Sequence, residues 1–167
     1  IDAGRAAEPS PTTEPTSSDE EERLPLSPVR RTIAERMVRS TTEIPEAWTV
    51  MEADVTGLVR LRETARANFQ QREGVNLTYL PFVLQVVAES LKEHRLVNST
   101  WAGDAIMLKG RINIGVAIAA PDGLVVPVVH DAGSLSVARL AKAVDDLASR
   151  ARQGKLDVTD VQGGTFT

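Results

Sequence analysis

The sequence predicts an α+β fold in which short strands gather in the middle of the chain and helices lie before and after them. Three observations predict it. Apolar residues recur at helical spacing between residues 28 and 94, the middle third changes to short β-prone segments, and helical spacing returns after residue 136. Because the strands are clustered and do not alternate strictly with helices, a sandwich of a sheet with helices packed on it is favoured over a doubly wound sheet.

The first predicted elements are a helix and a strand. Ser27 offers an N-cap and Pro28 a first-turn proline to an amphipathic helix over 28–40. Pro45 ends any continuation of that helix, because proline disfavours helical backbone before it and lacks an N–H. Residues 47–54 then predict a strand.

Two further helices are predicted before the strand-rich region. Thr56 can cap a helix that ends at Gly74, since glycine is common just past a helix C-terminus. Thr78 is the cap candidate for a third helix, whose wide apolar face indicates that it is largely buried up to about His94.

The middle third predicts four strands. Two short β-prone segments lie at 98–102 and 105–108, and two apolar runs lie at 112–119 and 124–129. Residues 120–123 (Ala-Pro-Asp-Gly) form a turn sequence that predicts an antiparallel hairpin between the two apolar runs. Since both runs are apolar at successive positions, we expect each to be covered on both faces.

A last helix is predicted to start after Ser136, its cap candidate, and to run to about residue 151. Arg150 and Arg152 fall near its end, where positive charge complements the helix dipole. The turn Asp122–Gly123 is explained by hairpin geometry, since glycine supplies a positive φ at no steric cost.

Charge and proline divide the chain near Leu26. Residues 1–25 hold seven acidic and two basic residues and four prolines, while the 167-residue chain as a whole has a net charge of −4. Such a segment has too little apolar surface to order itself. We therefore expect a flexible interdomain linker over 1–26 and a folded, nearly neutral region over 27–167.

The composition excludes several classes of function. The chain has no cysteine, which rules out a disulfide scaffold, a zinc–cysteine site and a cysteine nucleophile. Its mild acidity argues against nucleic acid or an anionic membrane as partner, and no apolar run reaches the length of a membrane helix. The expectation is a cytoplasmic protein with no metal site.

Only two histidines are available as general bases near neutral pH. His94 lies at a predicted helix end, where a solvated capping role is expected. His130 is followed by Asp131, but adjacent residues on a strand point to opposite faces, so a catalytic pair is disfavoured. No phosphate loop, nucleophile elbow or glycine-rich dinucleotide motif is present.

Five ordered segments make the region from residue 28 to the last residue resemble the dihydrolipoamide acyltransferases, the E2 components of 2-oxo acid dehydrogenase complexes. They are RRTIAERMVRS at 30–40, IPEAWTVMEADVTGLVRL at 44–61, NLTYLPFVLQVVAESLKE at 76–93, INIGVAIAAPDGLVVPVV at 112–129 and GGTFT at 163–167. The segments AW at 47–48 and NSTWAGD at 98–104 look most like the branched-chain members of bacteria, and the pyruvate members are the runner-up.

The resemblance implies a chloramphenicol-acetyltransferase-like sandwich and transfer of an acyl group from S-acyl-dihydrolipoyl-lysine to coenzyme A. The lipoyl-lysine would belong to an upstream domain. Arg62 matches the family arginine that reaches the phosphate end of coenzyme A, and Thr78 matches a family Ser/Thr near the same molecule. Two other contacts do not transfer, because Ala119 and Ala148 stand where relatives have polar residues.

The family's catalytic groups have no match in this chain. The resemblance implies a histidine in an HxxxDG motif as base and a hydroxyl just beyond GGTFT for the oxyanion, and both would follow Thr167. Neither His94 nor His130 stands in such a motif. We therefore expect the 167 residues to be the front part of a catalytic domain, truncated at its C-terminal side and inactive as they stand.

The resemblance also implies partners. The expected assembly is a set of homotrimers in a 24-subunit or, less often, a 60-subunit core that binds the E1 decarboxylase and the E3 dihydrolipoamide dehydrogenase in the bacterial cytoplasm. Three alternatives remain: acetyl transfer in a pyruvate dehydrogenase complex, a non-catalytic structural core, and a free acetyltransferase of the chloramphenicol-modifying type. The linker over 1–26 weighs against the last.

Overall fold

The computed structural model describes residues 24–121 and 123–167. The chain falls into two compact units, Ile1–Met51 and Glu52–Thr167, and each is described by itself. Most of the segment predicted to be a linker lies outside the described residues. No helix in the described ranges is both long and apolar enough to cross a membrane.

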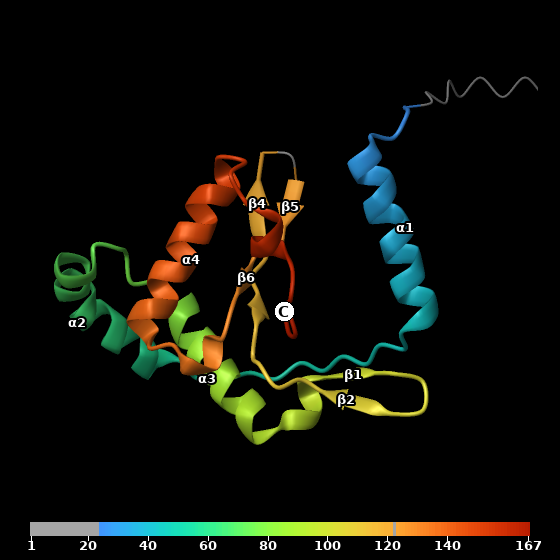
Figure 1. The fold of residues 1–167 in the computed structure, drawn as a ribbon. Helices are drawn as coiled ribbons and strands as arrows, with labels where there is room; N and C mark the ends of the chain where they lie inside the picture. Colours follow the sequence, from blue (N-terminus) through green and yellow to red (C-terminus); the bar gives the residue numbers. More distant parts are fainter. Residues whose placement is uncertain (1–23, 122) are drawn as a thin grey trace, which may run out of the picture. The chain divides into compact units, whose positions relative to one another are not determined.

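The first unit contains helix α1, Pro28–Glu43 (Figure 1). Ser27 caps it as predicted, since its hydroxyl accepts a hydrogen bond from the backbone N–H of Arg30 at 3.3 Å. The helix runs three residues beyond the predicted end and stops before Ile44, the residue that precedes Pro45. Its apolar residues Ile33 and Met37 are exposed.

The strand predicted at 47–54 is wrong for the described part of the chain. These residues carry no strand assignment, and Trp48 is 86% exposed. A run of β-prone side chains shows only that a segment would fit a sheet, because a strand exists only where a second backbone pairs with it.

The second unit begins with helices α2, Thr56–Glu73, and α3, Leu80–Glu93. Helix α2 ends at Gly74 as predicted, with the glycine in the left-handed region at φ 77°. Its cap is not Thr56, which is the first helical residue. The carboxylate of Asp54 accepts the backbone N–H of Thr56 at 2.8 Å, and this bond lowers the pKa of Asp54.

The predicted cap of α3 is also wrong. The helix starts at Leu80, two residues after Thr78, and no side chain caps it. A capping hydroxyl usually accepts from the second or third N–H beyond it, and the third residue beyond Thr78 is Pro81, which has none. The N–H groups of Phe82 and Val83 bond instead to the carbonyl of Tyr79.

All strands of the described chain pair antiparallel, in three two-stranded ladders. Strands β1, Ser99–Trp101, and β2, Ile106–Leu108, form a hairpin close to the predicted segments. The other ladders are β3, Ile114–Gly115, with β6, Val128–Val129, and β4, Ile118–Ala120, with β5, Gly123–Val125.

The last two ladders are halves of the one predicted hairpin. Ile114 faces Val129 and Ile118 faces Val125, so both ladders keep a single register. The gap between them falls at Pro127, which has no N–H to donate, although its carbonyl still accepts from Val116 at 2.8 Å. At the turn Gly123 has φ 133°, and Asp122 lies outside the described residues.

The prediction that this hairpin is covered on both faces holds only for its stem. Ile114, Val128 and Val129 are buried, but Leu124 near the tip is 66% exposed. The apolar run therefore predicted the strand correctly. It overestimated how much of the strand is covered by the rest of this chain.

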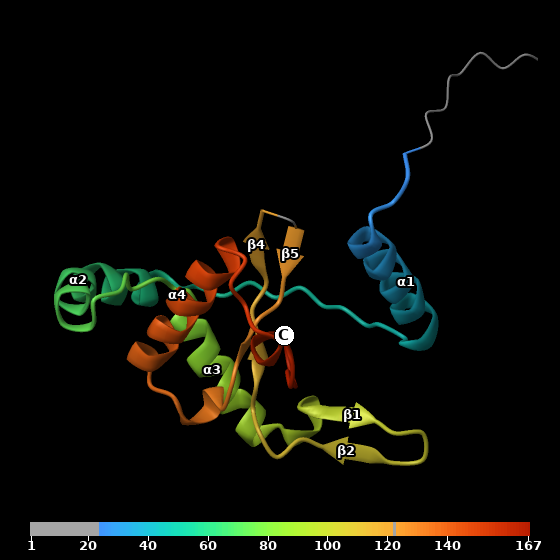
Figure 2. The ribbon, with the colours of Figure 1, turned by 45° about the horizontal axis from the view of Figure 1, so that its top comes forward.

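Helix α4, Val137–Arg152, completes the fold and is capped by Ser136 as predicted, through a bond from the backbone N–H of Arg139. Helices α3 and α4 pack on each other, and α4 also contacts β4 and β6 (Figures 1 and 2). Leu140 of α4 is fully buried in the core between them, together with Leu84, Ala88 and Val129.

The end of the described chain returns to the sheet. After the short 3-10 helix η3, Val158–Val161, residue Phe166 forms a parallel bridge with Ile114, and its carbonyl accepts from the N–H of Gly115 at 2.8 Å. Strand β3 therefore has β6 as an antiparallel partner and the 163–167 segment as a parallel one. This confirms the predicted mixed sheet with helices packed on it.

Candidate functional site

Arg62 is held at the join between α2 and α3 by two contacts. Its Nε donates a hydrogen bond to the carbonyl of Leu77 at 2.9 Å, and its guanidinium carbon lies 4.8 Å from the centre of the Tyr79 ring. Leu77 and Tyr79 flank Thr78, so the structure places Arg62 beside the segment that holds the second residue predicted to bind coenzyme A.

The chemistry of this pair suits a phosphate group. Within the described ranges Arg62 makes no ion pair, and because Nε is occupied by Leu77, its two terminal nitrogens are the donors left for a ligand. Thr78 is exposed, and its hydroxyl is free of the capping role predicted for it. A guanidinium in a fixed plane matches a phosphate with two parallel hydrogen bonds.

The sequence pattern does not reveal Tyr79 as part of this site. The ring lies under the guanidinium, in a cation–π contact that also limits the rotation of the Arg62 side chain. The two residues are 17 positions apart, with Arg62 on α2 and Tyr79 just before α3, and no periodicity links them. Only the adjacency of Tyr79 to Thr78 could have pointed to it.

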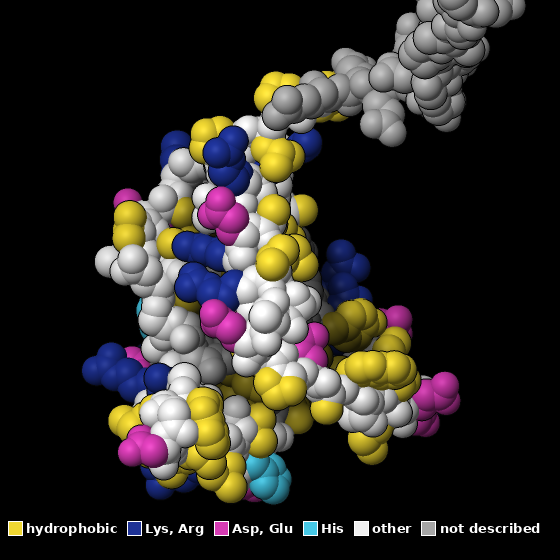
Figure 3. Space-filling view, turned by 90° about the vertical axis from the view of Figure 1, so that its right-hand side faces the viewer, with side chains coloured by type: hydrophobic (Ala, Val, Ile, Leu, Met, Phe, Trp, Pro, Cys, Tyr) yellow, Lys and Arg dark blue, Asp and Glu magenta, His cyan; other side chains and the backbone are white. Residues whose placement is uncertain are grey.

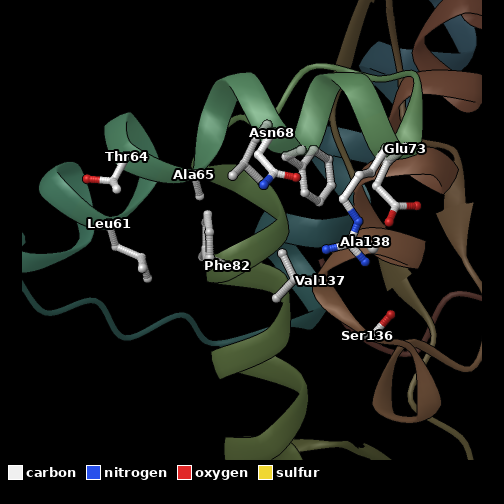
Figure 4. A pocket seen from close by; sticks show the side chains of 12 residues that line it. Leu61, Thr64, Ala65, Asn68, Glu73, Phe82, Ser136, Val137 and Ala138 are labelled. Carbon is white, nitrogen blue, oxygen red and sulfur yellow. The ribbon is translucent and has the colours of Figure 1, made fainter.

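A cavity of about 520 Å³ lies next to this pair (Figure 4). It shares Leu77 with the Arg62 contact. Its walls come from one face of α2, from Phe82 of α3 and from the start of α4, and they are mostly apolar. The lining residues are Leu61, Thr64, Ala65, Asn68, Phe69, Arg72, Glu73, Leu77, Phe82, Ser136, Val137 and Ala138.

One ion pair fixes the rim of this cavity. Lys142 of α4 lies 2.8 Å from the carboxylate of Glu73 in the last turn of α2, and its positive charge lowers the pKa of Glu73. This contact ties α2 to α4 at the side of the cavity.

The two alanines predicted to stand in place of polar family residues lie in different surroundings. Ala119 lies exposed on β4, and Ala148 packs against the apolar core from α4. A methyl side chain has no donor or acceptor, so neither position can offer a hydrogen bond from its side chain.

Neither histidine forms a catalytic arrangement in the described chain. His94 is the exposed C-cap of α3, as predicted. His130 Nε2 lies 3.3 Å from the carbonyl of Thr159, and the Asp131 carboxylate is 3.9 Å from Arg111. The two members of the disfavoured pair thus have different partners, Thr159 for His130 and Arg111 for Asp131.

An ion-pair cluster near the end of α4 was not predicted. Arg150 forms ion pairs with Asp146 at 2.9 Å and, through both terminal nitrogens, with Asp160 of η3. The guanidinium lowers the pKa of Asp160, and the two carboxylates raise that of Arg150. Besides its predicted interaction with the helix dipole, Arg150 therefore makes a tertiary contact. This contact holds η3, which precedes the 163–167 segment.

Comparison with known proteins places these features in one family. The model of the 2-oxoacid dehydrogenases acyltransferase (catalytic domain) matches residues 18–167. The lipoamide acyltransferase component of the branched-chain alpha-keto acid dehydrogenase complex of Bacillus subtilis is 45% identical over 165 residues, which are 97% of this chain and 39% of that protein.

Two solved structures share the fold. A probable dihydrolipoamide acetyltransferase from Listeria monocytogenes superposes with a TM-score of 0.84 at 46% identity, covering 89% of this chain and 63% of the other. The cubic core of a pyruvate dehydrogenase multienzyme complex gives a TM-score of 0.83 at 33% identity, covering 95% and 65%.

The present chain is shorter than these relatives. It spans about two fifths of the Bacillus subtilis protein and less than two thirds of each solved chain. The match nevertheless covers nearly all of the described residues, including α2, α3, the hairpin and the 163–167 segment. The chain therefore belongs to the 2-oxoacid dehydrogenase acyltransferase family and carries part of its catalytic domain.

Proposed function

We propose that the protein carrying this chain transfers an acyl group, of the branched-chain type, from S-acyl-dihydrolipoyl-lysine to coenzyme A as the E2 core of a 2-oxo acid dehydrogenase complex. The observation that carries the proposal is the 45% identity to a branched-chain component across 97% of the chain. Residues 1–26 would be the linker to an upstream lipoyl-bearing part, and residues 27–167 the front of the catalytic domain.

Arg62 and Thr78 would bind the phosphate end of coenzyme A. Support comes from their shared location, from the absence of a carboxylate partner for Arg62 in the described ranges, and from the exposed hydroxyl of Thr78. Tyr79 would keep the guanidinium plane fixed, which reduces the entropy lost when the phosphate binds.

The groups that perform the chemistry would come from the part of the domain that the solved relatives have and this chain does not cover. A histidine of an HxxxDG motif would take the proton of the coenzyme A thiol, since a thiol with a pKa near ~8.5 is mostly protonated at neutral pH. A hydroxyl shortly after GGTFT would stabilise the oxyanion of the tetrahedral intermediate. We expect the 167 residues alone to show no transfer.

Assembly forms part of the proposal. Homotrimers would build a 24-subunit core that binds E1 and E3, in the cytoplasm of a bacterium, and the similarity to a cubic pyruvate dehydrogenase core supports this geometry over the 60-subunit one. Sedimentation of the full-length protein distinguishes the two sizes directly. A stable monomer would contradict both.

The test of the activity is a comparison of acyl donors. Full-length protein whose lipoyl group is kept in the reduced, dihydro form is assayed in the reverse direction with isobutyryl-CoA and acetyl-CoA, and isobutyryl transfer should be the faster. Faster acetyl transfer would favour the pyruvate alternative, which the 46% identity to a probable dihydrolipoamide acetyltransferase supports. No transfer from either donor by an assembled core would favour a non-catalytic structural protein.

A further inference from the structure

Asn113 connects three parts of the chain that are distant in sequence. It lies just before β3 and is only 8% exposed. Its side-chain Nδ2 donates to the carbonyl of Gly163 at 2.7 Å, and its Oδ1 accepts from the backbone N–H of Asp131 at 2.9 Å. The amide thus links Asp131, the second residue after β6, to the start of the GGTFT segment.

The backbone of Asn113 holds the same segment. Its N–H donates to the hydroxyl of Thr165 at 3.1 Å, and its carbonyl accepts from the N–H groups of Thr165 at 2.8 Å and Phe166 at 3.2 Å. Together with the side-chain bond, one residue fixes the segment at Gly163, Thr165 and Phe166. None of these contacts can be read from local sequence, because about 50 residues separate the partners.

Both side-chain partners of Asn113 have a positive φ. Asp131 has φ 48°, the only positive value of a residue other than glycine in the described chain, and Gly163 has φ 76°, which glycine adopts without steric cost. A left-handed residue other than glycine is uncommon and persists where its surroundings fix it. The bond from the Asp131 N–H to Asn113 supplies such a restraint at that position.

We propose that Asn113 is a positioning residue for acyl transfer, because it sets the direction in which the chain leaves the 163–167 segment. The inference rests on the proposed function, in which a hydroxyl shortly after this segment stabilises the oxyanion. Asn113 does not touch the reacting atoms. It acts through Gly163, and a displacement of about 1 Å at a catalytic group can cost ~100-fold in rate.

Three variants of the full-length protein test this. Asn113→Ala removes both side-chain bonds, and Asn113→Asp keeps an acceptor for Asp131 but, when ionised, cannot donate to Gly163. Gly163→Ala strains the segment at its positive φ without changing Asn113. The matched control is Ser27→Ala, which removes the cap of α1 and makes no contact with the 163–167 segment among the described bonds.

The expected result is a fall of ~10- to 100-fold in kcat for all three variants, with KM for coenzyme A within about twofold of the wild-type value. Ser27→Ala should keep the wild-type kcat. Wild-type kcat in Asn113→Asp and Gly163→Ala, both folded, would overturn the inference, and so would an equal loss in Ser27→Ala.

Amide hydrogen exchange gives a readout that does not depend on activity. Asn113→Ala should speed exchange at Thr165, Phe166 and Asp131, and Asn113→Asp should speed it at Thr165 and Phe166. Ser27→Ala should change none of them. If the wild-type protein transfers no acyl group, the proposed function fails, and unchanged exchange in Asn113→Ala then separately overturns the positioning role.

Discussion

Arg62 is oriented before any ligand reaches it. The bond from its Nε to Leu77 and the stacking on Tyr79 hold the guanidinium in one plane, with its terminal nitrogens left for an anion. Arg62→Gln should therefore weaken binding of coenzyme A by ~1.5–3 kcal/mol, or about 10- to 100-fold in Kd. Titration calorimetry on the full-length protein measures this change.

A matched ligand and a matched variant make the test specific to the phosphate. Arg66→Gln removes the same charge from an exposed position one turn further along α2 and should leave Kd almost unchanged. With 3′-dephospho-coenzyme A the wild-type protein should bind about as weakly as Arg62→Gln binds coenzyme A. Equal losses in Arg62→Gln and Arg66→Gln would show only a general effect of charge.

Asp160 makes stability depend on pH. Its ion pair with Arg150 lowers its pKa in the folded state below the ordinary value of 3.8. The unfolded chain therefore binds this proton first as the pH falls, so the stabilisation is complete above the ordinary pKa and is lost as the pH drops through the lowered one.

Asp160→Asn removes that dependence. Urea unfolding between pH 6 and pH 3 should show that the free energy of unfolding falls more steeply for the wild-type protein than for the variant, and that the difference between them is greatest at the upper end of this range. Parallel curves would mean that the Arg150 contact does not persist in solution.

At the scale of elements, the sequence predicts the features that neighbouring residues determine. It misses those that need a second segment from elsewhere in the chain. The caps Ser27 and Ser136, the end of α2 at Gly74 and the hairpin turn all follow from a few neighbouring residues, and all are confirmed. The strand at 47–54 fails because pairing is not a local property.

The same distinction between local features and contacts across elements holds for the candidate site. The resemblance pointed to Arg62 and Thr78 by matching single positions. The cap predicted for Thr78 failed because α3 starts two residues later, and Pro81 removes one of the two N–H groups from which a capping hydroxyl could accept. Tyr79, the Arg150–Asp160 pair and the side-chain bonds of Asn113 join separate elements. Such contacts exist only after the elements have packed, so periodicity and spacing carry no signal of them.

Packing of α3 against α4 gives a prediction for these elements. Leu140 is fully buried between α4 and the sheet, whereas Val86 on α3 is 65% exposed. Leu140→Ala should lower the free energy of unfolding by ~2–5 kcal/mol through lost burial and a residual cavity. Val86→Ala should cost less than about 1 kcal/mol. Equal costs in urea unfolding would show that Val86 is covered in solution.

For the whole molecule, the described surface leaves many large apolar side chains exposed. They occur in both units, and Figure 3 shows hydrophobic side chains reaching the surface between charged ones. The set includes Ile33, Met37, Trp48, Val50, Met51, Trp101, Ile106 and Leu124. So many exposed large apolar side chains are typical of a chain that buries them against other protein.

This surface predicts how the 167-residue chain behaves by itself. It should bind the dye ANS and aggregate at micromolar concentration, because the apolar side chains lack the further domain and neighbouring subunits that the proposed core would provide. The full-length assembled protein should bind less dye per subunit. Substitution of Trp48 and Trp101 by serine should reduce dye binding by the isolated chain. Substitution of Leu140 should not reduce it, because that side chain is buried. A monodisperse, dye-free and cooperatively unfolding 167-residue chain would contradict this expectation, because it would show that the exposed apolar side chains are covered within one copy of the chain.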